Sequence, residues 1–122
     1  MKQKVYAALK VDDEIKEYLR QFFDVAFWDD DEVIPRETLL AAVADCDGIM
    51  LAGHKVDEEL LRRAPRLKVV SNVTVGYNNF DIAAMKQRQV LGSNTPGVVD
   101  DSTADLVFGL ILATARKIPH LN

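Results

Sequence analysis

The sequence predicts an α/β fold built on a five-stranded parallel sheet, and two observations support this. Short apolar runs alternate along the chain with stretches whose apolar residues recur at helical spacing. The chain has 122 residues, which suits one domain with a single hydrophobic core. Alternating strands and helices are joined by right-handed crossovers, which place the strands side by side and parallel. We expect the strand order 2-1-3-4-5.

The expected strands are short apolar runs, at residues 4–9, 24–28, 47–52, 67–73 and 89–93. The expected helices lie between them, at 12–23, behind Pro35 through Leu39, Leu40 and Val43, at 57–64 and at 81–88. Asp12 can serve as the N-cap of the first helix, and a proline is tolerated in the first turn of the second. Helices covering both faces of such a sheet give a flavodoxin-like three-layer sandwich.

The last segment, residues 102–116, is expected to be a helix with almost no polar face. Ser102 and Asp105 have the spacing of a capping box at its start. A helix without a polar stripe must be covered by another domain, another subunit or both, and a core helix of this same domain is the alternative. We assign residues 1–100 to one domain and 101–122 to an interdomain or dimerisation helix, and expect the chain to be cut before a second domain.

The composition excludes several functional classes. Apolar residues make up 48% and charged residues 28% of the chain, as in ordinary globular proteins, and a net charge of −4 argues against a nucleic-acid partner. No signal peptide and no run of about 18 apolar residues is present, so we expect neither export nor membrane insertion. The single cysteine, Cys46, favours a reduced thiol in the cytoplasm.

In open parallel sheets ligands bind beyond the carboxyl ends of the strands, where the strand order reverses. Neither a G-x-G-x-x-G nor a G-x-x-x-x-G-K-[ST] motif is present to hold phosphates. Val75 and Gly76 follow the fourth strand, and a glycine there permits positive φ and lets backbone N–H groups face outward to bind a small carboxylate. An ordinary tight turn is the alternative interpretation.

Two histidines and one acidic run are weaker candidates. His54 follows the third strand at the expected ligand edge and has a pKa suited to proton transfer, but we interpret it as a solvated loop residue. His120 has no carboxylate or nucleophile nearby in sequence and receives no role. The acidic residues 29–32 lack the spaced pattern of a calcium loop, so we expect no metal.

Five motifs in order carry a resemblance to a known family: DGIML from Asp47, LKVVS from Leu67, VGYNNFD from Val75, NTPG from Asn94 and STADLV from Ser102. Together they resemble the D-isomer-specific 2-hydroxyacid dehydrogenases, among which glyoxylate and hydroxypyruvate reductases look nearest. The resemblance covers essentially the whole chain. It implies the amino-terminal, substrate-binding part of an NAD- or NADP-dependent oxidoreductase that interconverts 2-oxoacids and 2-hydroxyacids.

The resemblance also assigns roles to single positions. Val75 and Gly76 match the backbone pair that holds the substrate carboxylate, and Thr103 matches a helix-start position near the nicotinamide. Residues Leu51, Ala52 and Gly53 match the loop on the other side of the substrate.

The same resemblance implies what this chain lacks. The Arg, His and Glu that act in catalysis belong to a portion beyond residue 122, so neither His54 nor His120 is expected to be catalytic. The final helix leads into a missing Rossmann domain and implies a homodimer through residues 102–116. By itself the chain should bind poorly and catalyse nothing.

Two other classes remain as alternatives. A signalling receiver domain has this topology and an acidic pair after its first strand, as Asp12 and Asp13 are here. It also needs an aspartate where Leu51 stands and a lysine after the fifth strand, where Asn94 and Thr95 stand. The third possibility is a flavodoxin-like module that binds a flavin or serves as an assembly surface.

Overall fold

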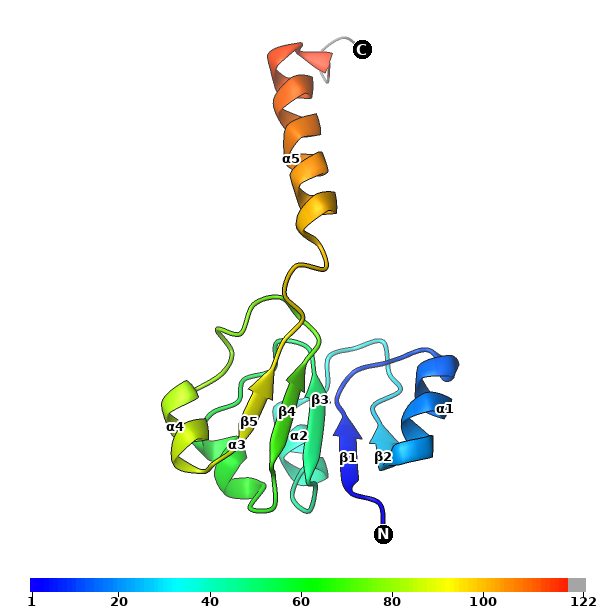
Figure 1. Ribbon diagram of the computed structural model, residues 1–122, viewed down its shortest axis with the longest axis vertical. Helices are drawn as coiled ribbons and strands as arrows, with labels where there is room; N and C mark the ends of the chain where they lie inside the picture. Colours follow the sequence, from blue (N-terminus) through cyan, green and yellow to red (C-terminus); the bar gives the residue numbers. More distant parts are fainter. Residues whose placement is uncertain (119–122) are drawn as a thin grey trace.

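The computed structural model describes residues 1–118 and contains the predicted parallel sheet (Figure 1). Its order is β2-β1-β3-β4-β5, and each neighbouring pair is parallel. The strands are β1 (Lys4–Ala7), β2 (Asp24–Phe27), β3 (Gly48–Leu51), β4 (Val69–Asn72) and β5 (Leu91–Ser93). Each strand lies inside its predicted run and is shorter than it. The predicted fold class and strand order are therefore confirmed.

Five helices are described, namely α1 (Asp13–Phe22), α2 (Arg36–Ala42), α3 (Glu58–Arg63), α4 (Ile82–Gln87) and α5 (Asp100–Ala115). The N-caps of α3 and α4 are aspartates. Asp57 accepts the Leu60 N–H at 3.1 Å, and Asp81 accepts the Ala84 N–H at 3.0 Å. Asp12 occupies the N-cap of α1 as predicted, but its side chain makes no capping hydrogen bond.

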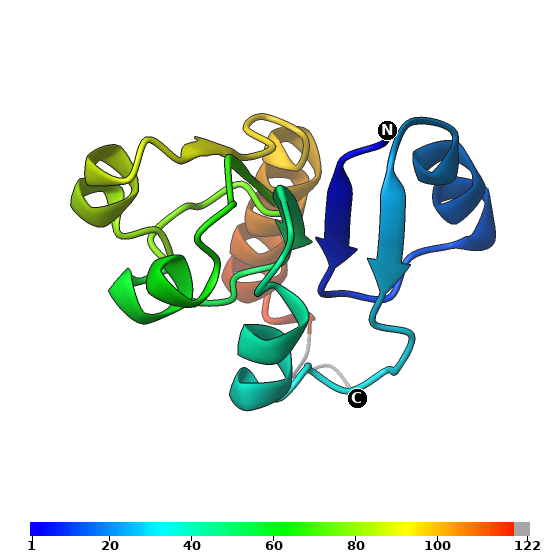
Figure 2. The same cartoon turned by 90° about the horizontal axis from the view of Figure 1, so that it is seen from below.

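The hydrophobic core lies on one face of the sheet. Ile49 of β3 and Val70 of β4 are buried there against α2, α3 and α4. The crossover from β1 to β2 runs across the sheet in the opposite sense to the later ones, so right-handed connections put α1 on the other face. Figure 2 shows α1 beside β2 at one end of the sheet, and α3 and α4 at the other. This second face is less completely covered: Val69 is 40% exposed and Leu91 is 72% exposed.

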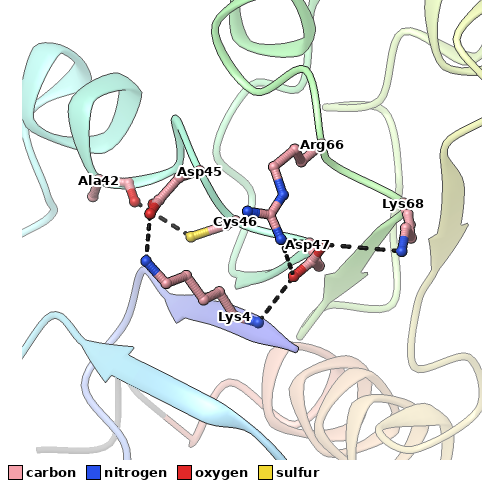
Figure 3. Close-up of polar contacts among 7 residues, drawn as sticks. All are labelled: Lys4, Ala42, Asp45, Cys46, Asp47, Arg66 and Lys68. Carbon is pink, nitrogen blue, oxygen red and sulfur yellow. Dashed lines mark hydrogen bonds and ion pairs between the residues drawn. The ribbon is translucent and has the colours of Figure 1, made fainter. Parts of the chain in front are cut away.

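A charged cluster ties the amino ends of three strands together (Figure 3). The Asp47 carboxylate accepts the backbone N–H of Lys4 at 3.0 Å, pairs with Arg66 at 3.2 Å and lies 3.9 Å from the Lys68 ammonium. The Lys4 N–H and then the Arg66 and Lys68 charges hold the pKa of the Asp47 carboxyl below its ordinary value. This cluster lies at the edge opposite the loops described below.

Helix α5 extends away from the sheet at the end to which the strand arrowheads point (Figure 1). None of its residues is buried, and Leu106 and Phe108 are each 64% exposed. The alternative of a core helix is therefore wrong. None of the helices within residues 1–118 is long and apolar enough to cross a membrane.

The predicted start of this helix is also wrong. Its N-cap is Val99 and its first residue Asp100, so Ser102 lies inside the first turn. The Ser102 hydroxyl donates to the Val99 carbonyl at 3.1 Å instead of capping an N–H group. His120, to which no role was assigned, lies outside the described residues.

Candidate functional site

Three loops are joined by hydrogen bonds at the carboxyl edge of the sheet, where β3, β4 and β5 end. They comprise residues 52–54 after β3, 73–79 after β4 and 94–95 after β5. The strand register explains their proximity, because Leu51 pairs with Asn72 and Ser71 with Ser93. This is also the end from which α5 leaves (Figure 1).

The turn at Val75 and Gly76 presents two backbone N–H groups. The Thr74 carbonyl accepts the Thr95 N–H at 2.9 Å, and the Val75 carbonyl accepts the Asn94 side-chain amide at 2.7 Å. A trans peptide is planar, so the N–H that follows each carbonyl points the opposite way. The Val75 and Gly76 N–H groups therefore face away from the 94–95 segment, and neither donates to any atom of residues 1–118. Both residues are exposed.

Gly76 does not adopt the positive φ that a glycine permits. Within the described residues, the glycines with positive φ are Gly53 at 74° and Gly97 at 79°. The amide pair is thus oriented by its hydrogen-bonded carbonyls and not by a left-handed glycine. A Cβ built on Gly76 would meet only the Asn78 Oδ1, at 3.7 Å, so the space on the side-chain side of Gly76 is open.

Asn72, the last residue of β4, holds the loops from inside and is only 1% exposed. Its Oδ1 accepts the Gly53 N–H at 3.2 Å, and its Nδ2 lies 2.8 Å from the Gly76 carbonyl oxygen. The same Nδ2 lies 2.6 Å from the Thr74 hydroxyl, which itself donates to the Gly76 carbonyl at 2.7 Å. The Asn79 carboxamide exchanges hydrogen bonds with that of Asn72 at 3.0 and 3.3 Å.

His54 is not the solvated loop residue that we expected. Both ring nitrogens are buried and have no hydrogen-bond partner among the described residues. Burial, followed by the positive charge of Arg36, lowers the pKa of the imidazole. The backbone carbonyl of His54 accepts the Asn79 side-chain amide at 2.8 Å. His54 thus belongs to the loop framework as a neutral, shielded ring.

The other predicted site residues lie in different environments. Leu51 is the last residue of β3, inside the expected strand, and its side chain is fully buried, so of the three matched positions only Ala52 and Gly53 lie in the loop. Ala52 and Gly53 are exposed beside the Asn72 carboxamide. Thr103 is exposed in the first turn of α5, where its N–H donates to the Val99 carbonyl at 2.9 Å.

The arrangement can bind an anion but offers no chemistry of its own. Two unpaired N–H donors side by side suit a carboxylate, which accepts charge-assisted hydrogen bonds. Among residues 1–118, no group of three His, Cys, Asp or Glu side chains could hold a metal ion.

Sequence reasoning did not assign to any residue the role of orienting the amides, which the structure gives to Asn72, Thr74, Asn79, Asn94 and Thr95. One signal was available. Asn72 interrupts the apolar run at residues 67–73, and an amide at the end of a buried strand needs hydrogen-bond partners.

Comparison with known proteins places this chain in a family. The family model described as D-isomer specific 2-hydroxyacid dehydrogenase, catalytic domain, matches residues 5–117. A glyoxylate reductase from Thermococcus litoralis is 40% identical over 119 residues, covering 97% of this chain and 36% of the relative. The chain thus spans little more than a third of that relative.

Solved structures agree on the fold. A protein from Pyrococcus horikoshii OT3 superposes with a TM-score of 0.79 at 31% identity, over 98% of this chain and 35% of its own. The NADPH-dependent glyoxylate/hydroxypyruvate reductase from Sinorhizobium meliloti, solved with NADP and malonate, gives a TM-score of 0.69 at 24% identity, over 93% of this chain and 34% of its own.

The chain is therefore a catalytic-domain segment of the α/β dehydrogenase class. It belongs to the D-isomer specific 2-hydroxyacid dehydrogenase family. This membership argues against the receiver and flavodoxin-like alternatives.

Proposed function

We propose that this chain is the substrate-binding part of an NAD(P)-dependent D-2-hydroxyacid dehydrogenase that acts on a small 2-oxoacid such as glyoxylate or hydroxypyruvate. The Val75 and Gly76 N–H groups hold the substrate carboxylate. One observation supports this above all: the carbonyls on the far side of both peptides are hydrogen-bonded to residues 94–95, which leaves both N–H groups turned outward. Ala52 and Gly53 border the same space.

In this proposal the chain orients the substrate and performs no proton transfer. A carboxylate fixed by two amides leaves the neighbouring carbonyl carbon in one position, which lowers the entropic cost of the reaction. NAD or NADP supplies the hydride when bound. Residues 1–118 have no glycine-rich turn at a helix start that fits the phosphates of a dinucleotide, so the proposal gives none of them the role of holding these phosphates. Thr103 is the position proposed to approach the nicotinamide.

The proposed domain boundary near residue 100 is based on the exposed apolar surface of α5. Residues 1–100 form the substrate domain, and 101–122 lead toward a Rossmann domain and a second subunit. The exposed apolar side chains of α5 support this, because such a surface is normally covered in a stable protein. A cytoplasmic location fits Cys46, whose buried thiol has a raised pKa, mainly through desolvation.

A fusion protein tests the proposed activity. Residues 1–122 would replace the matching segment of the Thermococcus litoralis glyoxylate reductase, and oxidation of NADH or NADPH would be followed with glyoxylate or hydroxypyruvate. We expect turnover with at least one of these acids. A correctly folded fusion that binds cofactor but reduces neither acid would count against the proposed function.

Binding to the chain itself can be measured separately. In a ¹H–¹⁵N correlation spectrum, oxalate should shift the Val75 and Gly76 amide resonances most. Oxamide, which has a similar shape but no charge, is the control ligand and should leave them in place. Shifts confined to other parts of the chain would contradict the proposed carboxylate site.

A further inference from the structure

We propose that Asn72 is a positioning residue that sets the separation of the Gly53 loop and the Gly76 turn. The inference rests on the proposed function, because it concerns how the carboxylate-binding amides are held. Asn72 itself is only 1% exposed and acts on the ligand through these two loops.

The two ends of the Asn72 carboxamide have different, fixed partners. Its Oδ1 accepts the Gly53 N–H at 3.2 Å, and its Nδ2 donates to the Gly76 carbonyl at 2.8 Å. A backbone N–H can only donate and a backbone carbonyl can only accept, so the carboxamide has one possible orientation. Aspartate offers acceptors only and leucine offers neither, so an asparagine is needed to join both loops at this size.

Burial makes this junction cooperative. A buried amide that loses a partner keeps the cost of its desolvation, so the hydrogen bonds of Asn72 form or fail together. Asn79 reinforces them through its reciprocal carboxamide pair with Asn72 and its hydrogen bond to the His54 carbonyl at 2.8 Å. Within residues 1–118, Asn72 is the one side chain hydrogen-bonded to both Gly53 and Gly76.

Asn72 also completes the fixing of the peptides around Gly76. Asn94 holds the carbonyl before Gly76, at 2.7 Å, and Asn72 with Thr74 holds the carbonyl after it. The Gly76 N–H lies in the first of these planes, and the second plane, which carries the Tyr77 N–H, holds the Gly76 Cα from its other side. If Asn72 loses its donor, the second plane keeps only the Thr74 hydroxyl, so Gly76 can shift and carry its N–H away from the position that meets a carboxylate.

The main variant is Asn72→Asp in the fusion protein described above. It keeps an acceptor for Gly53 but turns a carboxylate oxygen toward the Gly76 carbonyl. We expect KM for the 2-oxoacid to rise by about tenfold or more, with kcat and the cofactor KM within about twofold, since a hydrogen bond to an ionised group is lost or misdirected. Asn72→Ser, which is smaller and can donate and accept, should fold and show a smaller rise.

Asp47→Ala is the matched control, because it removes another buried polar side chain at the opposite edge of the sheet. It should lower the Tm and leave KM unchanged. If both Asn72 variants lower only the Tm and keep the parental KM, Asn72 has a structural role and the inference is overturned.

A measurement without ligand separates this inference from the proposed function. Thr74→Val removes a hydroxyl that contacts the Nδ2 of Asn72 and should shift the Gly53 amide resonance in the isolated chain. The same change made in the Asn72→Ser background should shift it much less. An unmoved Gly53 resonance in the first case would overturn the coupling, whereas a fusion protein inactive on 2-oxoacids would overturn only the proposed function.

Discussion

The side-chain amide of Asn94 donates to the carbonyl of Val75 at 2.7 Å, although the two residues follow different strands. Next to it, the Thr95 N–H donates to the Thr74 carbonyl at 2.9 Å. The segment between β5 and α5 thus determines which way the two amides after β4 point. The orientation of the proposed carboxylate site therefore depends on the linker to the last helix.

Replacing Asn94 should weaken substrate binding. In Asn94→Leu the Val75 carbonyl loses its partner, so the peptide that carries the Gly76 N–H can rotate. We expect KM for the 2-oxoacid in the fusion protein to rise by about tenfold, with the cofactor KM unchanged. Gln87→Leu, at an exposed position of α4, is the control and should behave like the parent. Identical kinetics for the Asn94 variant and the parent would remove Asn94 from the site.

A side chain at Gly76 should obstruct the ligand without disturbing the fold. A Cβ there would touch only the Asn78 Oδ1 at 3.7 Å, and the backbone does not need a glycine because φ is not positive. Gly76→Val should raise KM for the 2-oxoacid by about tenfold or more and leave cofactor affinity nearly unchanged, and Gly76→Ala should do so less. Steady-state kinetics of the fusion protein check this. A Gly76→Val variant with parental KM would reject the amide pair as the binding site.

Gly92 should be intolerant of a side chain for a different reason. A Cβ at this β5 position would lie 2.7 Å from Cε2 of Phe80 and 3.1 Å from Cε of Met85. Gly92→Ala should therefore lower the free energy of unfolding by about 1–3 kcal/mol, as overpacked cores do. Gly109→Ala is the same change in α5, where nothing lies within 4 Å, and should not destabilise the protein. Urea denaturation of both variants compares them, and equal midpoints would contradict the contact.

The stability of the protein should fall in mild acid because of His54. Its pKa is lowered in the folded state, so between pH 6.5 and that lower pKa the unfolded chain binds more protons. The stabilisation is complete above pH 6.5 and is lost as the pH falls through the folded pKa. His54→Phe should show a smaller loss over this range in urea denaturation. Parallel pH profiles for the variant and the parent would show that His54 does not contribute.

The exposed surface of α5 should cause the isolated chain to associate. Leu106, Phe108 and Ile111 are each more than half exposed, and such apolar side chains are normally covered. We expect light scattering to show dimers or larger species as concentration rises, and Phe108→Glu to shift the equilibrium toward monomer. A strictly monomeric parent at high concentration would contradict association through residues 102–116.

The sheet could be predicted from the sequence because its signal is local. The alternation of apolar runs and helical periods fixes the element order, and right-handed crossovers then restrict the strand order. Strand ends were less accurate, since residues such as Leu67 are apolar and buried but lie just outside the ladder of β4. The capping box at Ser102 failed because two aspartates before it extend the helix, and Val99 becomes the N-cap.

The candidate site could be predicted only in part. Its location followed from the strand ends, and the amide pair followed from the glycine after β4. The contacts of Asn94 and Asn72 could not be predicted, because they depend on the register between strands, in which Leu51 pairs with Asn72 and Ser71 with Ser93. The burial of both His54 nitrogens could not be predicted either, because the loop that carries His54 is held by Asn79, which is 25 residues away in sequence.

Because of the hydrogen bonds made by the linker between β5 and α5, a minimal substrate domain must extend beyond the hydrophobic core. The hydrophobic core already includes its last member at Val90, so a chain ended after β5 would keep every buried apolar contact. It would nevertheless lose the donors of Asn94 and Thr95 and release both carbonyls of the turn. Protease cleavage between Ser93 and Asn94 should thus give an amino-terminal fragment that unfolds cooperatively but no longer binds oxalate.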